Sequence, residues 1–167
     1  MEKSTTVSLR DATAADLPRI AEIYNHFVRT STCTFATEPE GEGYWKSWLE
    51  AHSDVHPAIV AERLGDVVGW GTLSKWNSRC AYRQTVENSV YVRHDAHGSG
   101  VGRTILDELI RRARASGHRT IVAQISDDQA ASKALHKRVG FSEVGVLRNV
   151  GFKFGRWLDV GIWQLIV

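Results

Sequence analysis

The chain has few cysteines and no long apolar run. Its two cysteines, Cys33 and Cys80, form no Cys-x-x-Cys pair and no cluster with the spacing of metal ligands. We therefore expect reduced thiols, a reducing compartment and no metal. No segment approaches the roughly 18 consecutive apolar residues that a membrane-spanning helix needs. The first twelve residues also lack the apolar core of a secretory signal.

The chain also lacks an excess of charge of either sign. A formal net charge of +2 at pH 7 is too small to indicate nucleic acid or an anionic membrane surface as a partner. Hydrophobic residues make up 43% and charged residues 24% of the 167 positions, which are ordinary globular values. These features predict a single cytoplasmic domain over residues 1–167, with no nucleic-acid or membrane partner.

Hydrophobic periodicity predicts the order of the structural elements. Strands are expected at 7–12, at 84–94, at 119–125, as a hairpin within 57–76 and as a closing pair over 141–167. Helices are expected at 14–30, 44–52, 102–117 and 127–140, with a long loop at 31–43. The order βα(α)βββαβαββ predicts an α/β (α+β) fold with a mixed, mostly antiparallel, seven-stranded sheet and about four helices. It argues against a Rossmann fold, in which strands and helices alternate regularly.

Residues 97–104, HGSGVGRT, place three glycines at alternate positions before a helix. N–H groups at a helix N-terminus bind anions, and glycines let several of them converge. A mononucleotide loop needs glycine at 97 and lysine at 103, where His97 and Arg103 stand. A dinucleotide loop needs its third glycine one residue later. We therefore expect this loop to form a diphosphate site that is neither a mononucleotide loop nor a dinucleotide loop. The alternative is a turn between strand and helix that binds nothing.

The sequence resembles the GNAT superfamily of N-acetyltransferases. The acetyl-CoA loop of that superfamily, Arg/Gln-x-x-Gly-x-Gly/Ala, falls on 97–102 with histidine at its first position. Four longer segments resemble phosphinothricin acetyltransferases: STCTFATEP (31–39), AYRQTVENSVYV (81–92), ALHKRVGF (134–141) and GFKFGRWLDVGIWQ (151–164). The resemblance implies the GNAT fold and transfer of acetyl from acetyl-CoA to the α-amine of compounds such as phosphinothricin or methionine sulfoximine.

The resemblance also implies which residues bind the cofactor. Main-chain groups of the strand at 90–92 would bond the pantetheine arm, and the loop at 97–103 would hold the diphosphate. Gln129 stands where relatives often have an asparagine that bonds the pantetheine, and Ser132 is expected beside it. The expected cofactor-binding residues are Val90, Tyr91, Val92, His97, Gly98, Ser99, Gly100, Val101, Gly102, Arg103, Gln129 and Ser132.

Two residues are candidates for the proton transfers. An α-amine with a pKa of about 8 is mostly protonated at pH 7, so a general base helps. Glu87 lies on the strand of the cofactor contacts, on the face opposite Val90. His136 stands where many relatives have a tyrosine near the coenzyme A sulfur, and its imidazole could protonate the leaving thiolate. A solvent-facing position is the alternative for both.

Candidate substrate residues come from the matching segments and the strand before them. An amino-acid-like ligand carries a carboxylate, which arginine binds with two parallel hydrogen bonds. The candidates are Phe35, Lys75, Trp76, Arg79, Arg83, Thr85 and Lys153, with core packing or a solvated surface as the alternative. Relatives are commonly homodimers, so a homodimer is expected. Two other functions stay open: a protein or peptide N-acetyltransferase, and a coenzyme-A-binding module without transfer activity.

Overall fold

One twisted sheet contains all seven strands, in the order β1-β2-β3-β4-β5-β7-β6. The computed structural model describes residues 6–167. The strands are β1 Ser8–Asp11, β2 Ala58–Arg63, β3 Asp66–Lys75, β4 Thr85–Val92, β5 Thr120–Ser126, β6 Ser142–Lys153 and β7 Arg156–Ile166. Only β4 and β5 pair in parallel, and all other neighbours are antiparallel. The predicted mixed, mostly antiparallel sheet is confirmed.

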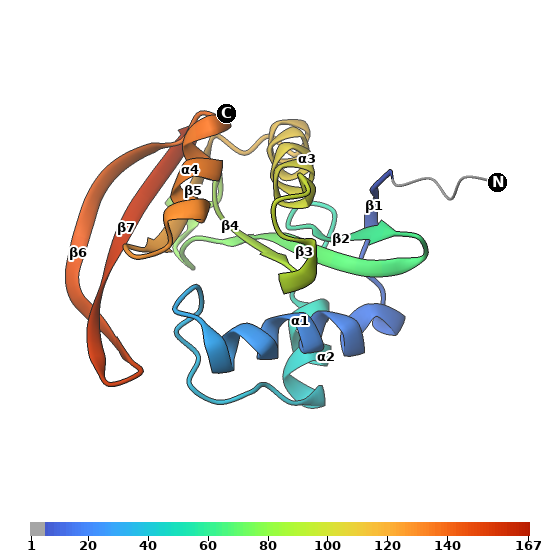
Figure 1. Ribbon diagram of the computed structural model, residues 1–167. Helices are drawn as coiled ribbons and strands as arrows, with labels where there is room; N and C mark the ends of the chain where they lie inside the picture. The colour runs from blue at the N-terminus through green and yellow to red at the C-terminus, as the bar shows by residue number, and fades with distance from the viewer. Residues whose placement is uncertain (1–5) are drawn as a thin grey trace.

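Four α-helices cover the two faces of the sheet (Figure 1). Helices α1 (Leu17–Thr30) and α2 (Glu42–Glu50) lie below the sheet in that view, while α3 (Val101–Ala115) and α4 (Ala130–Arg138) lie above it. A capping box precedes α1, in which the Asp16 carboxylate accepts hydrogen bonds from the Thr13 N–H and hydroxyl, at 2.7 and 2.9 Å.

Helix boundaries differ from the prediction by one to three residues, as α2 and α4 illustrate. Helix α2 begins and ends two residues before the expected 44–52, because Gly41 caps it and Glu42 in its first turn pairs with Lys46 at 2.7 Å. Helix α4 begins three residues later than expected, because a turn fixes the chain after β5. In that turn the Asp127 N–H donates to the Asp159 carbonyl at 2.9 Å.

The expectation that the chain carries no secretory signal lies partly outside the described residues, since it includes residues 1–5. Within residues 6–167, no helix combines the length and the apolar character needed to cross a membrane.

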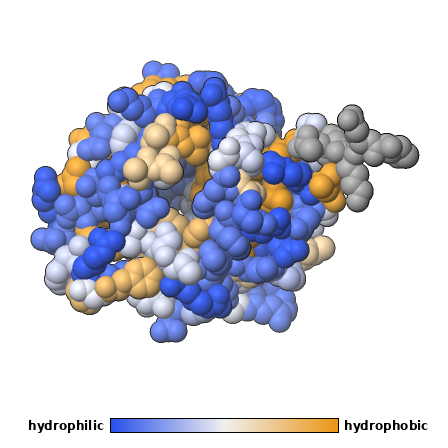
Figure 2. Space-filling view, viewed as in Figure 1, coloured by the Kyte–Doolittle hydropathy of each residue, from blue (hydrophilic) through white to orange (hydrophobic). Residues whose placement is uncertain are grey.

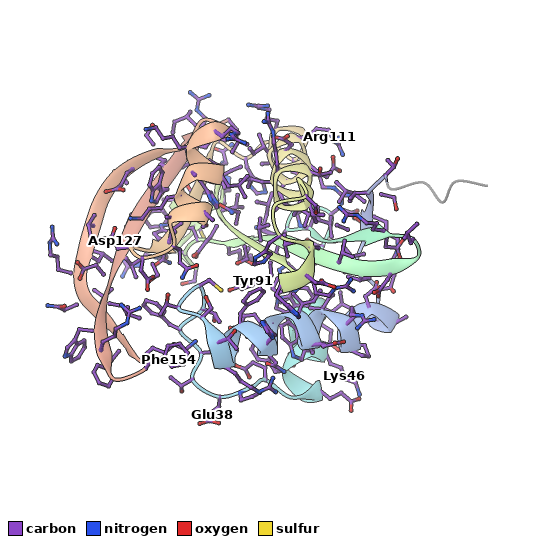
Figure 3. The ribbon with its side chains drawn as sticks, viewed as in Figure 1. Glu38, Lys46, Tyr91, Arg111, Asp127 and Phe154 are labelled. Atoms are coloured by element: carbon purple, nitrogen blue, oxygen red, sulfur yellow. The ribbon has the colours of Figure 1, made fainter. Side chains whose placement is uncertain are left out.

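Each face of the sheet has its own core. Under α3, buried Ile105, Leu106 and Leu109 pack against the strands, with Val90 and Val92 at the margin. Under α1 and α2 the core is largely aromatic, and Tyr91 stacks on Trp70 with ring centroids 4.7 Å apart. Figure 3 labels Tyr91 between β4 and α1. Alternation along β4 therefore sends Val90 and Val92 to one face and Tyr91 to the other, as predicted.

The sheet opens between its two parallel strands. β4 and β5 pair only at Thr85 with Thr120, Val86 with Ile121 and Glu87 with Val122. Beyond these positions β4 stays paired to β3 as far as Val92, and β5 stays paired to β7 as far as Ser126. The two strands therefore part toward their carboxyl ends and leave a wedge-shaped gap inside the sheet.

Candidate functional site

A cavity of about 790 Å³ occupies the gap between β4 and β5. It opens as a hollow near the middle of the face seen in Figure 2. Its walls come from β4, the 97–103 loop, the end of β5, α4 and the 31–35 loop. The predicted residues that line it are Glu87, His136, Val90, Tyr91, Val92, His97, Gly98, Gly100, Val101, Gly102, Arg103, Gln129, Ser132 and Phe35. The structure thus brings both catalytic candidates and most cofactor candidates together.

The carboxyl-terminal half of β4 offers its edge to this cavity. From Asn88 to Val92 it has no strand partner on the β5 side. Buried backbone N–H and C=O groups are nearly always hydrogen-bonded in proteins. An extended ligand with amide groups, lying along this edge, would supply the missing partners.

The glycine loop ends at the first turn of α3. Gly98 and Gly100 have φ angles of 73° and 85°, values that side-chain-bearing residues rarely adopt. An added Cβ at either position would meet nothing within 4 Å, so backbone conformation rather than space requires glycine there. Gly100 is the N-cap of α3. The first turn of the helix, with its N–H groups and the positive end of the helix dipole, therefore lines the cavity, an arrangement that suits an anion.

The structure gives His97 a role that the sequence left unexplained. Its Nε2–H donates to the Val92 carbonyl at 2.8 Å. Its ring stacks on Phe27, with centroids 5.7 Å apart and planes 3° from parallel. His97 therefore ties the start of the loop to the end of β4. Because His97 occupies the Val92 carbonyl, a ligand along the β4 edge would pair with the other backbone groups of that edge.

Glu87 lies where the two strands begin to part, and its side chain is half-buried. Burial raises the pKa of Glu87 above its usual value, while a hydrogen bond from Gln124 opposes that rise. The Gln124 Nε2–H donates to Glu87 Oε1 at 3.0 Å. A carboxyl group with a raised pKa inside a cavity suits a general base that works near neutral pH.

His136 is buried, and both of its ring nitrogens lie within hydrogen-bond distance of other protein groups. Its Nδ1 lies 2.8 Å from the Ser132 carbonyl, which can only accept, so Nδ1 carries a proton. Its Nε2 lies 3.0 Å from Asn88 Nδ2, and burial lowers the pKa of the ring. The neutral imidazole then accepts at Nε2 and has no proton there to give to a thiolate. The expected acid role stays a prediction that this geometry does not support, because a donating amide and a carbonyl hold both ring nitrogens.

Two further cofactor candidates are engaged with the protein itself. The Gln129 Nε2–H donates to Thr32 Oγ1 at 2.8 Å, so this amide already has a partner. Ser99 does not line the cavity, because its hydroxyl donates to the Ala96 carbonyl at 2.6 Å and accepts from Arg63 at 2.9 Å. Side-chain contacts from Gln129 and Ser99 to a cofactor stay predictions, and this arrangement lends them no support.

The 31–35 loop forms the wall opposite α4 and is anchored from both sides. Thr32 Oγ1 donates to Asp128 at 2.7 Å, and Arg156 donates to the same carboxylate at 2.5 Å. Burial alone would raise the pKa of Asp128, but the hydrogen bonds from Thr32, Arg156 and Ser126 outweigh it and bring the pKa to about 2. Phe35 packs over Gly151, where a Cβ would come within 2.1 Å of the ring.

Lys153 helps to anchor the 31–35 loop and does not line the cavity. Its buried ammonium donates to the carbonyls of Ser31 and Thr34, both at 2.7 Å. Burial lowers the pKa of Lys153. The predicted role in binding a substrate carboxylate stays a prediction that this geometry does not support, because two loop carbonyls already hold this cation.

Five other substrate candidates do not line the cavity of this chain. They precede β4 or lie at its beginning, where β4 and β5 are still paired, whereas the cavity opens toward the other end of the strands. The exposed cations among them are solvated in the single chain. The five are Lys75, Trp76, Arg79, Arg83 and Thr85, and their role in substrate binding stays a prediction that this geometry does not support.

Sequence reasoning missed Asn88 and Gln124. Asn88 breaks the apolar alternation of Val86, Val90 and Val92, and that signal was present in the sequence. Gln124 lies on another strand, and its relation to Glu87 depends on the register of β4 against β5.

Comparison with known proteins adds independent findings. The model of the "Acetyltransferase (GNAT) domain" family matches residues 9–162. The chain is 40% identical to a phosphinothricin N-acetyltransferase of Streptomyces viridochromogenes, over 95% of this chain and 86% of that protein. It is 42% identical to an L-methionine sulfoximine/L-methionine sulfone acetyltransferase of Pseudomonas paraeruginosa, over 96% and 94% of the two chains.

Solved structures agree with these matches. A phosphinothricin acetyltransferase from Sinorhizobium meliloti in complex with acetyl-CoA superposes with a TM-score of 0.93 at 37% identity, covering 97% of this chain and 89% of that chain. A ribosomal-protein-alanine N-acetyltransferase from Brucella melitensis superposes with a TM-score of 0.93 at 41% identity, covering 96% and 99%.

Proposed function

The chain belongs to the acetyltransferase (GNAT) domain family, and on that premise we propose that it transfers the acetyl group of acetyl-CoA to the α-amine of a small amino-acid-like substrate. One observation carries this proposal. A half-buried carboxylate, Glu87, shares a single cavity with a glycine loop at a helix N-terminus. The relatives named for phosphinothricin and methionine sulfoximine support an amino-acid analogue as the substrate.

The cavity suits acetyl-CoA on the side of α3 and α4. The loop amides near Gly98 and Gly100, with Arg103 beside them, would hold the diphosphate. The free edge of β4 from Asn88 to Val92 would pair with the amides of the pantetheine arm. Acetyl-CoA, when bound there, supplies an acetyl group activated as a thioester. A β4 N–H pointing at the thioester carbonyl would stabilise the negative charge that grows on its oxygen.

Glu87 would act on the substrate amine. Its carboxylate takes a proton from the ammonium group, so the neutral amine can attack the carbonyl carbon of the thioester. The C–N bond forms as the C–S bond breaks, the acylated nitrogen releases its excess proton, and the thiolate takes up that proton and leaves as the thiol. His136 would orient this region as a fixed neutral ring, held by Asn88 and Ser132.

A homodimer is part of the proposal. We define the hairpin patch as the exposed apolar residues of the β6–β7 hairpin: Val144, Leu147, Val150, Phe152, Phe154 and Trp157. Figure 3 shows Phe154 at the tip of this hairpin. Large exposed apolar patches commonly mark sites of protein–protein contact. In the part of the chain that the structure describes, the lysines and arginines that line the cavity are Arg103 and Arg138, on α3 and α4. A second copy could supply the cation that a substrate carboxylate needs.

Two readings compete with this function. A protein N-acetyltransferase is favoured by the likeness to the ribosomal-protein-alanine enzyme, but the 31–35 loop, which lines the cavity, is tied to Asp128 and Lys153, so it would have to release these contacts to make room for a longer peptide. A binding module without transfer activity would not need Glu87 inside the cavity. A cytoplasmic location also stays part of the proposal, because the free thiols of Cys33 and Cys80 suit a reducing compartment.

Replacing the proposed base tests the chemistry. We expect Glu87→Gln to keep acetyl-CoA affinity within about twofold and to lower kcat by ~100- to 10,000-fold, the usual contribution of a general base. Glu87 acts when ionised, and its pKa is raised. Wild-type kcat/KM should therefore fall as the pH drops through a value above 4.5, and this decrease is the acid limb of the pH profile. Glu87→Gln should lose the acid limb. The control is Glu50→Gln, an exposed position at the end of α2. Wild-type turnover in Glu87→Gln would refute the role.

An isosteric pair at Gly100 tests the diphosphate site. Asn and Asp both tolerate positive φ better than other side chains, so Gly100→Asn and Gly100→Asp share any backbone effect. A carboxylate at the anion site should repel the diphosphate. We expect Gly100→Asp to bind acetyl-CoA at least tenfold more weakly than Gly100→Asn by isothermal titration calorimetry, since ~1.4 kcal/mol of repulsion gives that factor. Equal affinities would place the diphosphate elsewhere.

Charge placed in the hairpin patch tests the dimer. Trp157 is 63% exposed on β7, so lysine there should leave the fold intact and oppose burial between two copies. We expect wild type to sediment as a dimer at micromolar concentration and Trp157→Lys as a monomer. Val55→Lys, at an exposed apolar position outside the hairpin patch, should stay dimeric. A monomeric wild type would contradict the assembly.

A further inference from the structure

Gln124 is the first β5 residue on the face of Glu87 after the two strands part. Glu87 pairs with Val122, the last position of the β4–β5 ladder. Side chains alternate along a strand, so Gln124, two residues further, shares the face of Val122 and Glu87. Its Nε2–H donates to Glu87 Oε1 at 3.0 Å. A side-chain hydrogen bond thus bridges the gap at the point where backbone pairing ends.

This bond acts on one oxygen of the carboxylate. Among residues 6–167, Gln124 is the one side chain that donates to Glu87, and it reaches Oε1. Both residues line the cavity. A carboxylate with one oxygen tied is restricted in rotation, and its second oxygen stays available to a ligand in the same space. The amide cannot take a proton itself, so it orients the carboxylate without competing for the substrate proton.

We propose that Gln124 is a positioning residue for Glu87, fixing Oε1 so that Oε2 faces the substrate amine. The inference rests on the proposed function, in which Glu87 is the base. Gln124 also favours the charged form, because an N–H donor stabilises a carboxylate and not the neutral acid. Burial opposes this effect, because it raises the pKa of the Glu87 carboxyl group. The glutamine therefore keeps a half-buried carboxylate ionised at the pH where it must accept a proton.

Gln124→Met removes the donor and keeps the length of the side chain. The charged form of Glu87 loses its partner, so we expect the acid limb of kcat/KM to move up by about 0.5 to 1 pH unit, the shift that corresponds to one ordinary hydrogen bond. A carbon-13 NMR titration of the Glu87 carboxyl in the ligand-free protein should show the same shift. At the pH plateau, kcat should fall several-fold while the acetyl-CoA dissociation constant stays unchanged.

A second variant and a matched control accompany it. Gln124→Glu would place another carboxylate beside Glu87, and two such groups cannot both ionise freely. We expect it to move the acid limb further upward than Gln124→Met does. Gln84→Met removes a glutamine that donates to the Gly117 carbonyl at 3.4 Å, outside the cavity. That control should keep the wild-type limb and the wild-type carboxyl titration.

The outcomes separate this inference from the proposed function. Upward shifts in both Gln124 variants, with none in Gln84→Met, support it. A Glu87 titration in Gln124→Met identical to wild type would overturn it, even if Glu87→Gln abolishes the acid limb as the function requires. If Glu87→Gln instead retains wild-type turnover and pH profile, the proposed base itself is wrong.

Discussion

The parting of β4 and β5 is the constraint on which the site depends. The two strands share three paired positions and then separate, yet each keeps its outer neighbour, β3 or β7, along the rest of its length. The inner edges can therefore open without unravelling the sheet. The open edge of β4 leaves backbone groups that require hydrogen-bonding partners, and the cavity is the space in which a ligand would supply them.

The two faces of β4 carry different candidate residues of the site. On one face Asn88, Val90 and Val92 look toward α3 and α4, where the glycine loop and His136 lie. On the other face Glu87 and Tyr91 look toward the 31–35 loop and α1. A thioester lying along β4 would therefore be reached by an amine from the Glu87 side. In the proposed function, alternation of side chains, a property of any strand, would separate the cofactor from the substrate.

Local sequence patterns predicted much of the fold and part of the candidate site. Periodicity predicted every strand, and the spacing in HGSGVGRT, with its place before a helix, indicated the anion site. The missing parts are contacts between distant segments, such as Gln124 with Glu87, Asn88 with His136 and Lys153 with Ser31. These contacts follow from strand register and hairpin placement, which no local window contains. The partners Ser31 of Lys153 and Asn88 of His136 lie 122 and 48 residues away along the chain.

Hydrogen exchange with and without acetyl-CoA tests most directly whether the gap between β4 and β5 is the cofactor site. Amides that gain a hydrogen-bonding partner exchange more slowly. Saturating acetyl-CoA should slow exchange along the β4 edge from Asn88 to Val92 and in the 97–103 loop, and should leave the β2–β3 turn at Leu64 unchanged. Protection confined to other segments, with none on β4, would contradict the assignment of this gap as the cofactor site.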